Sequence, residues 1–150
     1  MSELRDSRQR KADVFAALEA NADAWLATAS PSGRPHLIAV SCWWHDGRLT
    51  IATRTRSQTA HNLESTRTGR LALGSPADVV MIDVELADAV AVAAADPALA
   101  AGFAAGVGWD PAEEGADWWF FTLRPIRIQA HRGYGELEGR DVMRDGRWLA

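Results

Sequence analysis

The chain of 150 residues has the length of one domain, and its 47% of apolar residues is enough to fill one hydrophobic core. Charged residues make up 24% and the net charge is -4, which excludes a disordered chain and argues against nonspecific nucleic-acid binding as the main activity. The first eleven residues are too charged for a signal peptide, and no apolar stretch would span a bilayer. We therefore expect a cytoplasmic protein that binds neither membranes nor nucleic acid.

The candidates for catalytic and metal-binding side chains are few. The single cysteine, Cys42, excludes an internal disulfide and a cysteine-rich zinc site, and it lies in an apolar segment without an activating neighbour. The four histidines lie far apart, with no spacing typical of metal ligands, and no segment matches a nucleophile elbow. We assign no metal site, and the catalytic residues stay unknown. An enzyme with this sequence would rely on a cofactor for the difficult chemistry.

The first expected elements are a helix and two strands. Apolar residues at helical spacing predict an amphipathic helix over residues 6–21 that covers one end of a sheet. A strand follows over residues 23–30, and a turn rich in proline and glycine over residues 31–35. The segment 36–44 is long and nearly all apolar, so we expect a strand that is buried on both faces.

The next segment combines a hairpin and a short helix. Asp46-Gly47 is typical of a tight hairpin turn, and it leads into a returning strand over residues 49–53. With the preceding turn, this predicts three antiparallel strands in a row. Ser57 is placed to cap a short helix that runs to about residue 66, with Leu63 as its inward anchor.

The second half predicts three more strands and one more helix. A short strand over residues 71–73 precedes a long one over residues 79–92, in which β-branched residues alternate. Asp96-Pro97 has the pattern of a helix start, with aspartate as the N-cap and proline in the first turn, and the helix ends near residues 106–108. The last long strand, over residues 118–129, contains Pro125, which indicates a bulge or an edge.

Six closely connected strands with helices at the periphery predict a mainly β fold, a small antiparallel β-barrel. The connections are too short for the crossovers of a parallel sheet. We expect a single domain over residues 1–150, which divides into a helix over about 6–21, a barrel over about 23–132 and a polar C-terminal tail over 133–150.

Charge is distributed unevenly along the chain. Between residues 48 and 70 there is one acid and a group of five arginines, namely Arg48, Arg54, Arg56, Arg67 and Arg70. Residues 83–117 contain eight acids and no basic residue. A basic island in an acidic protein can attract a small anionic ligand without attracting polyanions in general. A solvated arginine-rich face is the alternative.

The strand-to-helix segment 52–63 is the strongest candidate for an anion site. A strand ends there in hydroxyls and arginines, and a helix begins at a serine. The free backbone N–H groups of a helix N-terminus, surrounded by arginine and hydroxyl side chains, can bind a phosphate. A helix cap with exposed arginines would have the same pattern.

Seven tryptophans are many for this length. In the adjacent pairs Trp43-Trp44 and Trp118-Trp119, the two rings must lie on opposite faces of the sheet. One face can belong to the barrel core, and the other needs cover from a partner subunit, a helix or a ligand. We expect the chain to form a homodimer.

The order of these motifs resembles that of a known family. The segment Trp25 to His36 is similar to the opening "LATxxxxGxPH" of the pyridoxamine 5'-phosphate oxidase-like, FMN-binding split-barrel family. Residues 57–63 are similar to its "S-x-K-A-x-N-L", and residues 128–132 to its final strand "I/V-x-A-W-R". The resemblance extends from about residue 12 to residue 135. It implies a homodimeric, six-stranded antiparallel split barrel that holds a flavin (FMN) or a deazaflavin (F420) in a groove at the dimer interface.

The resemblance assigns candidate residues to the cofactor phosphate. Thr53 and Ser57 match hydroxyl positions at the phosphate, and Asn62 matches the asparagine of the short helix. Gln58 and Thr59 fall where relatives often place basic residues, with a lysine frequent at the position of Thr59.

The resemblance also assigns a position to the ring and shows two departures. Residues Ile38, Ala39, Val40 and Ser41 fall where relatives run their backbone alongside the ring. The basic residue is missing at Thr59, and Arg54 and Arg56 would supply the charge if their side chains reach the same pocket. His131 replaces a tryptophan. These departures leave open a member that binds its cofactor weakly, binds another one, or binds none.

Three functions follow from these expectations. The first is an oxidoreductase that uses FMN or F420 to transfer a hydride or two electrons to a small substrate. The second is a non-catalytic protein of the same fold that carries a flavin, F420 or haem. The third is a structural or regulatory dimer with an empty groove. The short tail has three arginines, unlike the longer arginine-rich segment of true pyridoxamine phosphate oxidases, so we do not expect that activity.

Overall fold

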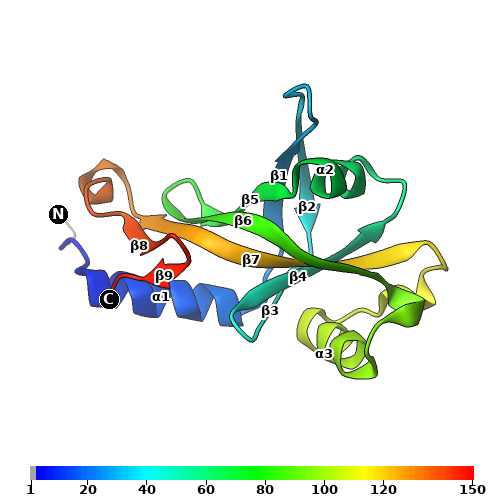
Figure 1. The fold of residues 1–150 in the computed structure, drawn as a ribbon. Coiled ribbons are helices and arrows are strands. Elements are labelled where there is room, and N and C mark those ends of the chain that lie inside the picture. The colour runs from blue at the N-terminus through cyan, green and yellow to red at the C-terminus, as the bar shows by residue number, and fades with distance from the viewer. Residues whose placement is uncertain (1–2) are drawn as a thin grey trace.

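A computed structural model describes residues 3–150, and within this range nine strands form one antiparallel sheet (Figure 1). The strands are β1 (Ala24–Ala29), β2 (Pro35–Val40), β3 (Trp43–His45), β4 (Arg48–Arg54), β5 (Thr68–Ser75), β6 (Asp78–Ala91), β7 (Trp118–His131), β8 (Asp141–Arg144) and β9 (Arg147–Trp148). The helices are α1 (Ser7–Glu19), α2 (Gln58–Thr66) and α3 (Pro97–Val107), with 3-10 turns over η1 (Val92–Ala94), η2 (Pro111–Glu113) and η3 (Tyr134–Glu136). The described helices are not long and apolar enough to cross a membrane.

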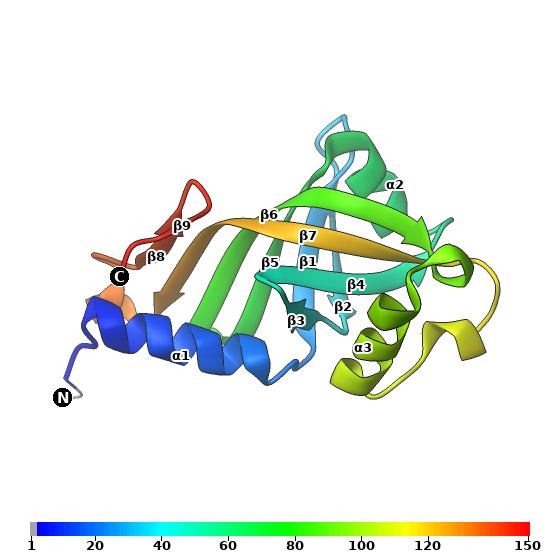
Figure 2. The same cartoon turned by 60° about the horizontal axis from the view of Figure 1, so that its bottom comes forward.

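The sheet closes because one segment of the chain serves both of its ends. The strand order is β2-β1-β5-β6-β7-β4-β3, so β2 and β3 lie at opposite ends although only Ser41 and Cys42 separate them in sequence. The sheet must therefore curl until its ends meet (Figure 2). This confirms the antiparallel barrel. Its six strands become nine because the expected second strand is two strands and because β8 and β9 form an additional hairpin on β7.

The expectation for residues 36–44 is wrong in two respects. The segment is interrupted at Ser41 and Cys42, and β2 pairs only with β1 while β3 pairs only with β4, so the three strands do not lie in a row. The outer face of β2 has no cover from the described chain, and Leu37 on that face is 60% exposed. An apolar run does not reveal which neighbours will cover it.

The barrel interior is filled by inward-facing aliphatic and aromatic side chains, which include Leu26, Ile51, Leu71, Ile82, Phe121 and Ile128. Helices α1 and α2 cover opposite ends of the barrel in both views (Figures 1 and 2). Asp6 caps α1 by accepting a hydrogen bond from the Gln9 amide, and Val14 and Leu18 face the core. In α2, the fully buried Leu63 is the expected inward anchor.

A second apolar cluster lies under α3, outside the barrel. Asp96 caps α3 as expected, and Phe103 packs against Phe120 of β7 with ring centroids 5.2 Å apart. The ring of Trp43 belongs to this cluster, whereas Trp44 packs on the barrel core, so the adjacent rings lie on opposite faces as predicted. A helix therefore provides the expected cover for the outer ring.

The polar tail folds back on its own chain. Val142 and Met143 are buried in the barrel core, and Trp148 stacks on Phe15 of α1 with a centroid distance of 4.6 Å. Pro125 marks the predicted irregularity in β7, because the pairing of β6 with β7 shifts register between Asp83 and Val84.

A buried ion pair joins the two ends of the described chain. Glu136 is 1% exposed, and its carboxylate accepts a 2.6 Å hydrogen bond from the Arg5 guanidinium, together with the backbone amides of Arg5 and Arg132. The hydrogen bonds from Arg5 hold the pKa of Glu136 at about 2, below its ordinary value of 4.5. A carboxylate with so many donors is ionised in the folded protein across the neutral range.

We predict that Glu136→Gln lowers the free energy of unfolding at neutral pH by about 1.5–3 kcal/mol, because a neutral amide cannot replace the charge-assisted hydrogen bonds to the buried Arg5, which keeps only its half-exposed partner Asp13. The folded-state pKa lies below the unfolded one, so the contribution of the pair is complete above pH 4.5 and is lost as the pH falls toward 2. Urea unfolding at several pH values should show the difference between variant and parent shrinking in that window. Glu85→Gln, at an exposed pair with Arg124, is the control and should cost at most about 1 kcal/mol. If the difference in unfolding free energy between variant and parent did not change with pH, this account would be contradicted.

Close packing of α3 against Trp43 yields a second prediction. A Cβ added at Gly102 or at Gly106 would overlap the indole of Trp43, which also stacks on His45 at 3.8 Å and has little room to move. Gly102→Ala and Gly106→Ala should each destabilise the protein by about 1–3 kcal/mol, although alanine is the better helix former. Thermal unfolding measures the effect, and Ala101→Leu on the exposed face of α3 is the control. Stabilisation by either glycine substitution would refute this packing.

Candidate functional site

The start of α2 has the geometry of an anion-binding helix terminus. Ser57 caps the helix: its Oγ accepts a 3.0 Å hydrogen bond from the Ala60 amide, and Thr53 Oγ1 at the end of β4 donates to it at 3.0 Å. The amides of Gln58 and Thr59 belong to the first turn, where no intrahelical carbonyl can accept from them. They therefore add positive potential at this end of the helix.

Two arginines of the basic island lie beside this terminus without an acidic partner. Arg54 and Arg56 are exposed, and neither forms an ion pair with any residue in the range 3–150. The guanidinium of Arg54 lies 5.5 Å from the ring centroid of Trp118. By contrast, Arg67 donates to the Leu86 carbonyl and Arg70 pairs with Asp83, so the island divides into engaged and available arginines.

A hollow of about 320 Å³, here called the α2 hollow, opens between the β1–β2 turn and the first turn of α2. It is lined by Ser30, Arg34, Pro35, His36 and Gln58. Of these, only Gln58 is among the cofactor-binding candidates that the sequence predicts. Arg34 is exposed and has no ion pair within the described residues. The turn rich in proline and glycine before β2 indicates where Arg34 lies, because such a turn presents its side chains at the rim of the sheet.

Asn62 connects α2 to β1 through a short chain of hydrogen bonds. Its Oδ1 accepts from Gln58 Nε2 at 2.8 Å, and its Nδ2 donates to Thr28 Oγ1 at 3.0 Å. Asn62 and Thr28 are both buried. Since a buried polar group is expensive to leave unpaired, this chain fixes the side chain of Gln58 at the α2 hollow.

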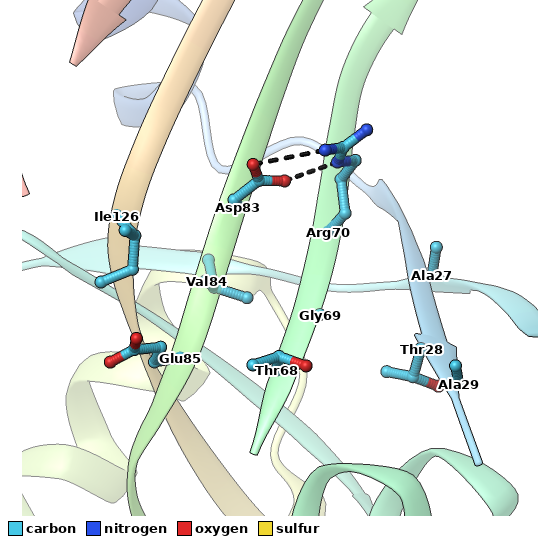
Figure 3. A pocket seen from close by; sticks show the side chains of 10 residues that line it. All are labelled: Ala27, Thr28, Ala29, Thr68, Gly69, Arg70, Asp83, Val84, Glu85 and Ile126. Carbon is cyan, nitrogen blue, oxygen red and sulfur yellow. Dashed lines mark hydrogen bonds and ion pairs between the residues drawn. The ribbon is translucent and has the colours of Figure 1, made fainter. Parts of the chain in front are cut away.

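A larger groove of about 490 Å³, here called the sheet groove, lies across β1, β5 and β6 (Figure 3). Ala27, Ala29 and Gly69 are small and leave it open. Arg70 and Asp83 face each other across the neighbouring strands and form a hydrogen bond of 2.5 Å. Its remaining lining residues are Thr28, Thr68, Val84, Glu85 and Ile126. Thr28 is therefore shared between this groove and the hydrogen bonds that lead to the α2 hollow.

The four β2 candidates do not share one environment. Ile38 packs against the barrel core and Val40 belongs to it, whereas Ala39 is exposed on the outer face. Ser41 lies in the break after β2, where its hydroxyl donates to Asp23 and accepts from Trp109 Nε1 at 2.9 Å. Of these four candidates, Ala39 is the exposed one.

Three further polar residues bear on the chemistry of the site. Thr59 is fully buried and its hydroxyl has no hydrogen-bond partner in the described structure, so only its backbone amide faces the helix terminus. His131 Nδ1 is likewise buried without a partner among residues 3–150. Burial raises the pKa of Cys42 to about 12, so its thiol stays protonated and inert.

Comparisons with solved structures show the same fold in proteins that are described by different functions. The chain resembles an F420 reductase with a TM-score of 0.63 and 20% identity, over 75% of this chain and 93% of that one. It resembles a pyridoxamine 5'-phosphate oxidase-related, FMN-binding protein from Nostoc punctiforme with a TM-score of 0.57 and 16% identity, over 87% of each chain. A heme-binding protein from Mycobacterium smegmatis aligns with a TM-score of 0.65 and 18% identity, over 97% of this chain and 60% of that one.

The sequence itself identifies the family. No curated protein sequence matches the chain significantly. A family model described as pyridoxamine 5'-phosphate oxidase matches residues 11–122, which include α2, the barrel strands β1 to β6 and the first part of β7. The match therefore covers both the α2 hollow and the greater part of the sheet groove. The chain belongs to the pyridoxamine 5'-phosphate oxidase family.

Proposed function

We propose that this protein is a homodimeric oxidoreductase, one split-barrel domain over residues 1–150, that uses FMN or the deazaflavin F420. The observation that carries the proposal is the combination of open first-turn amides in α2 with three arginines, Arg34, Arg54 and Arg56, that form no ion pair with the described residues. Similar proteins are described as an F420 reductase and as an FMN-binding protein, which supports this class of cofactor.

The residues at the start of α2 fit a phosphate group. The amides of Gln58 and Thr59 would donate to its oxygens, and the capping hydroxyl of Ser57 lies on the same turn. Arg54 and Arg56 would supply the charge that Thr59 does not, since arginine pairs well with phosphate oxygens. The orphaned hydroxyl of Thr59 is buried on the inner side of the helix, so we assign Thr59 a backbone role only.

The outer face of the sheet fits a flat ring. Ala39 of β2 and the small residues Ala27 and Ala29 of β1 leave an open apolar surface, and the Arg70–Asp83 pair forms a polar border on the far side of the sheet groove. The bound ring would supply hydride or two-electron transfer. The chain's own residues would bind and orient the ring and exclude water. No acid or base is assigned, because the charged side chains that line the sheet groove are paired, Arg70 with Asp83 and Glu85 with Arg124.

The same outer face supports the dimer. Trp25 is 54% exposed and Leu37 is 60% exposed, and they lie on the same side of the paired strands β1 and β2, on either side of Ala27 and Ala39. Large uncovered apolar side chains on one face mark an interaction surface. A second copy placed there would also close the ring site, so cofactor binding and association would stabilise each other.

A non-catalytic carrier of a flavin, F420 or haem is the alternative. The absence of a basic side chain at Thr59 favours it, because a weaker phosphate site suits reversible binding, and a heme-binding protein shares the fold. An absorption spectrum of the purified protein, followed by titration with FMN, F420 and haem, distinguishes the cofactors. Reductase assays at saturating cofactor then separate an enzyme from a carrier.

We predict that Arg54→Ala combined with Arg56→Ala lowers the affinity for FMN or F420 at least tenfold, because charge-assisted contacts to the phosphate are lost. Quenching of tryptophan fluorescence during titration measures the affinity. Arg8→Ala, at an exposed position of α1 far from α2, is the matched control and should bind as the parent does. Equal affinity in the double variant and the parent would show that the phosphate does not lie at α2.

For the dimer, Trp25→Glu combined with Leu37→Glu should weaken self-association at least tenfold, because four charges would be buried across a two-fold interface. Sedimentation velocity over a range of concentrations measures the change. Leu149→Glu adds a charge at another exposed apolar position and should leave the oligomeric state unaltered. A parent protein that stays monomeric with cofactor bound, or a double variant that stays dimeric, would exclude this interface.

A further inference from the structure

A third hollow, of about 560 Å³, lies on the barrel away from α2. Three segments meet there: the turn between β3 and β4, the irregular part of β7 around Pro125, and the tail hairpin β8–β9. We call it the arginine hollow. Its lining residues are Gly47, Arg48, Arg124, Pro125, Ile126, Met143, Asp145, Gly146, Arg147 and Trp148, so it shares only Ile126 with the sheet groove and none with the α2 hollow.

Two copies of one tripeptide contribute lining residues to this hollow. Asp-Gly-Arg occurs at residues 46–48 and again at residues 145–147. In both copies the aspartate and the glycine have positive φ, with 49° and 71° in the first turn and 52° and 76° in the second. Both are tight hairpin turns, and in each the arginine is the first residue of the returning strand, Arg48 of β4 and Arg147 of β9.

The second turn is held against β7 and cannot swing away freely. The Gly146 amide donates to the Ile126 carbonyl at 2.8 Å, and Ile126 is the residue of β7 that the bulge leaves without a partner in β6. The hairpin is anchored beneath by the buried Met143, and Trp148 is stacked on Phe15. The arginine hollow therefore has a fixed wall even though its rim is exposed.

The hollow carries an excess of positive charge, part of which a neighbouring acid balances. Three arginines and one aspartate line it, which gives a formal charge of +2 in a chain whose net charge is -4. Arg48 and Arg147 form no ion pair with any described residue, whereas Arg124 pairs with Glu85 at 2.7 Å. Two arginines without an ionic partner among the described residues attract an anion that can bridge them, and the single aspartate that lines the hollow, Asp145, does not balance both.

We propose that the arginine hollow binds a small organic molecule with at least two oxyanion groups, phosphoryl or carboxylate, which bridge Arg48 and Arg147. The volume lies in the range of small-molecule sites and is large for a single inorganic ion. Arg124 is a third donor if it releases Glu85, and the apolar side chains of Met143 and Ile126 contact the body of the molecule. This proposal is independent of the proposed phosphate site at α2, since the arginine hollow and the α2 hollow share no lining residue.

Isothermal titration at low salt with ADP, pyrophosphate and citrate tests the proposal. We expect saturable binding of at least one of them, weakened at least tenfold by Arg48→Gln and by Arg147→Gln. ADP or pyrophosphate binding more tightly than citrate identifies phosphoryl groups as the ligand chemistry, and the reverse order identifies carboxylates. Arg8→Gln is the control for a general loss of positive charge, and thermal unfolding verifies that each variant is folded.

The Arg54→Ala, Arg56→Ala variant separates this site from the proposed phosphate site at α2. Binding that persists in this variant but weakens with Arg48→Gln and Arg147→Gln supports the arginine hollow. Binding that is lost in the Arg54, Arg56 variant and unchanged in the other two overturns it, as does an equal loss with Arg8→Gln. Absence of saturable binding by all three probes also overturns it.

Discussion

The barrel exists because the segment 35–45 cannot be one straight strand. β2 must pair with β1 and β3 must pair with β4, and those partners lie at opposite ends of the strand order. The short break at Ser41 and Cys42 therefore forces the whole sheet to curl, and the curl creates an interior for the apolar side chains. It also leaves β2 as an end strand with one unpaired edge. The closed core and the unpaired edge are thus two results of the same constraint.

The proposed cofactor site depends on that constraint as well. Because β1 and β2 form a hairpin at the end of the sheet, their turn reaches the start of α2 and brings Arg34 to the helix terminus. Asn62 and Thr28 then link the helix to β1 through buried hydrogen bonds. The arginines that remain without acidic partners near α2 are those that a phosphate could use, whereas Arg70 is already engaged by Asp83. Local pairing thus determines which part of the basic island is available.

Features with local causes could be predicted from the sequence. Asp6, Ser57 and Asp96 cap their helices because a cap needs only residues within one turn, and Asp46-Gly47 forms its hairpin for the same reason. The family resemblance and the barrel followed from the order of such signals. Three features depend on residues distant in sequence: the role of Arg34, the division of segment 36–44 into two strands, and the folding of the tail. The pair of Arg5 and Glu136, 131 positions apart, had no sequence signal at all.

The place of β7 in the sheet has a consequence for synthesis on the ribosome. β7 lies between β6 and β4. Among the described strands, it alone joins the hairpin of β3 and β4 to the rest of the sheet by hydrogen bonds, since the other connection is the covalent link through residues 41 and 42. It ends at His131, and the Arg5–Glu136 contact follows five residues later. A nascent chain that lacks these residues therefore holds two separate pieces of sheet with open edges. The barrel can close only after residues 118–136 have emerged, and until then the apolar strands are exposed to association with other chains.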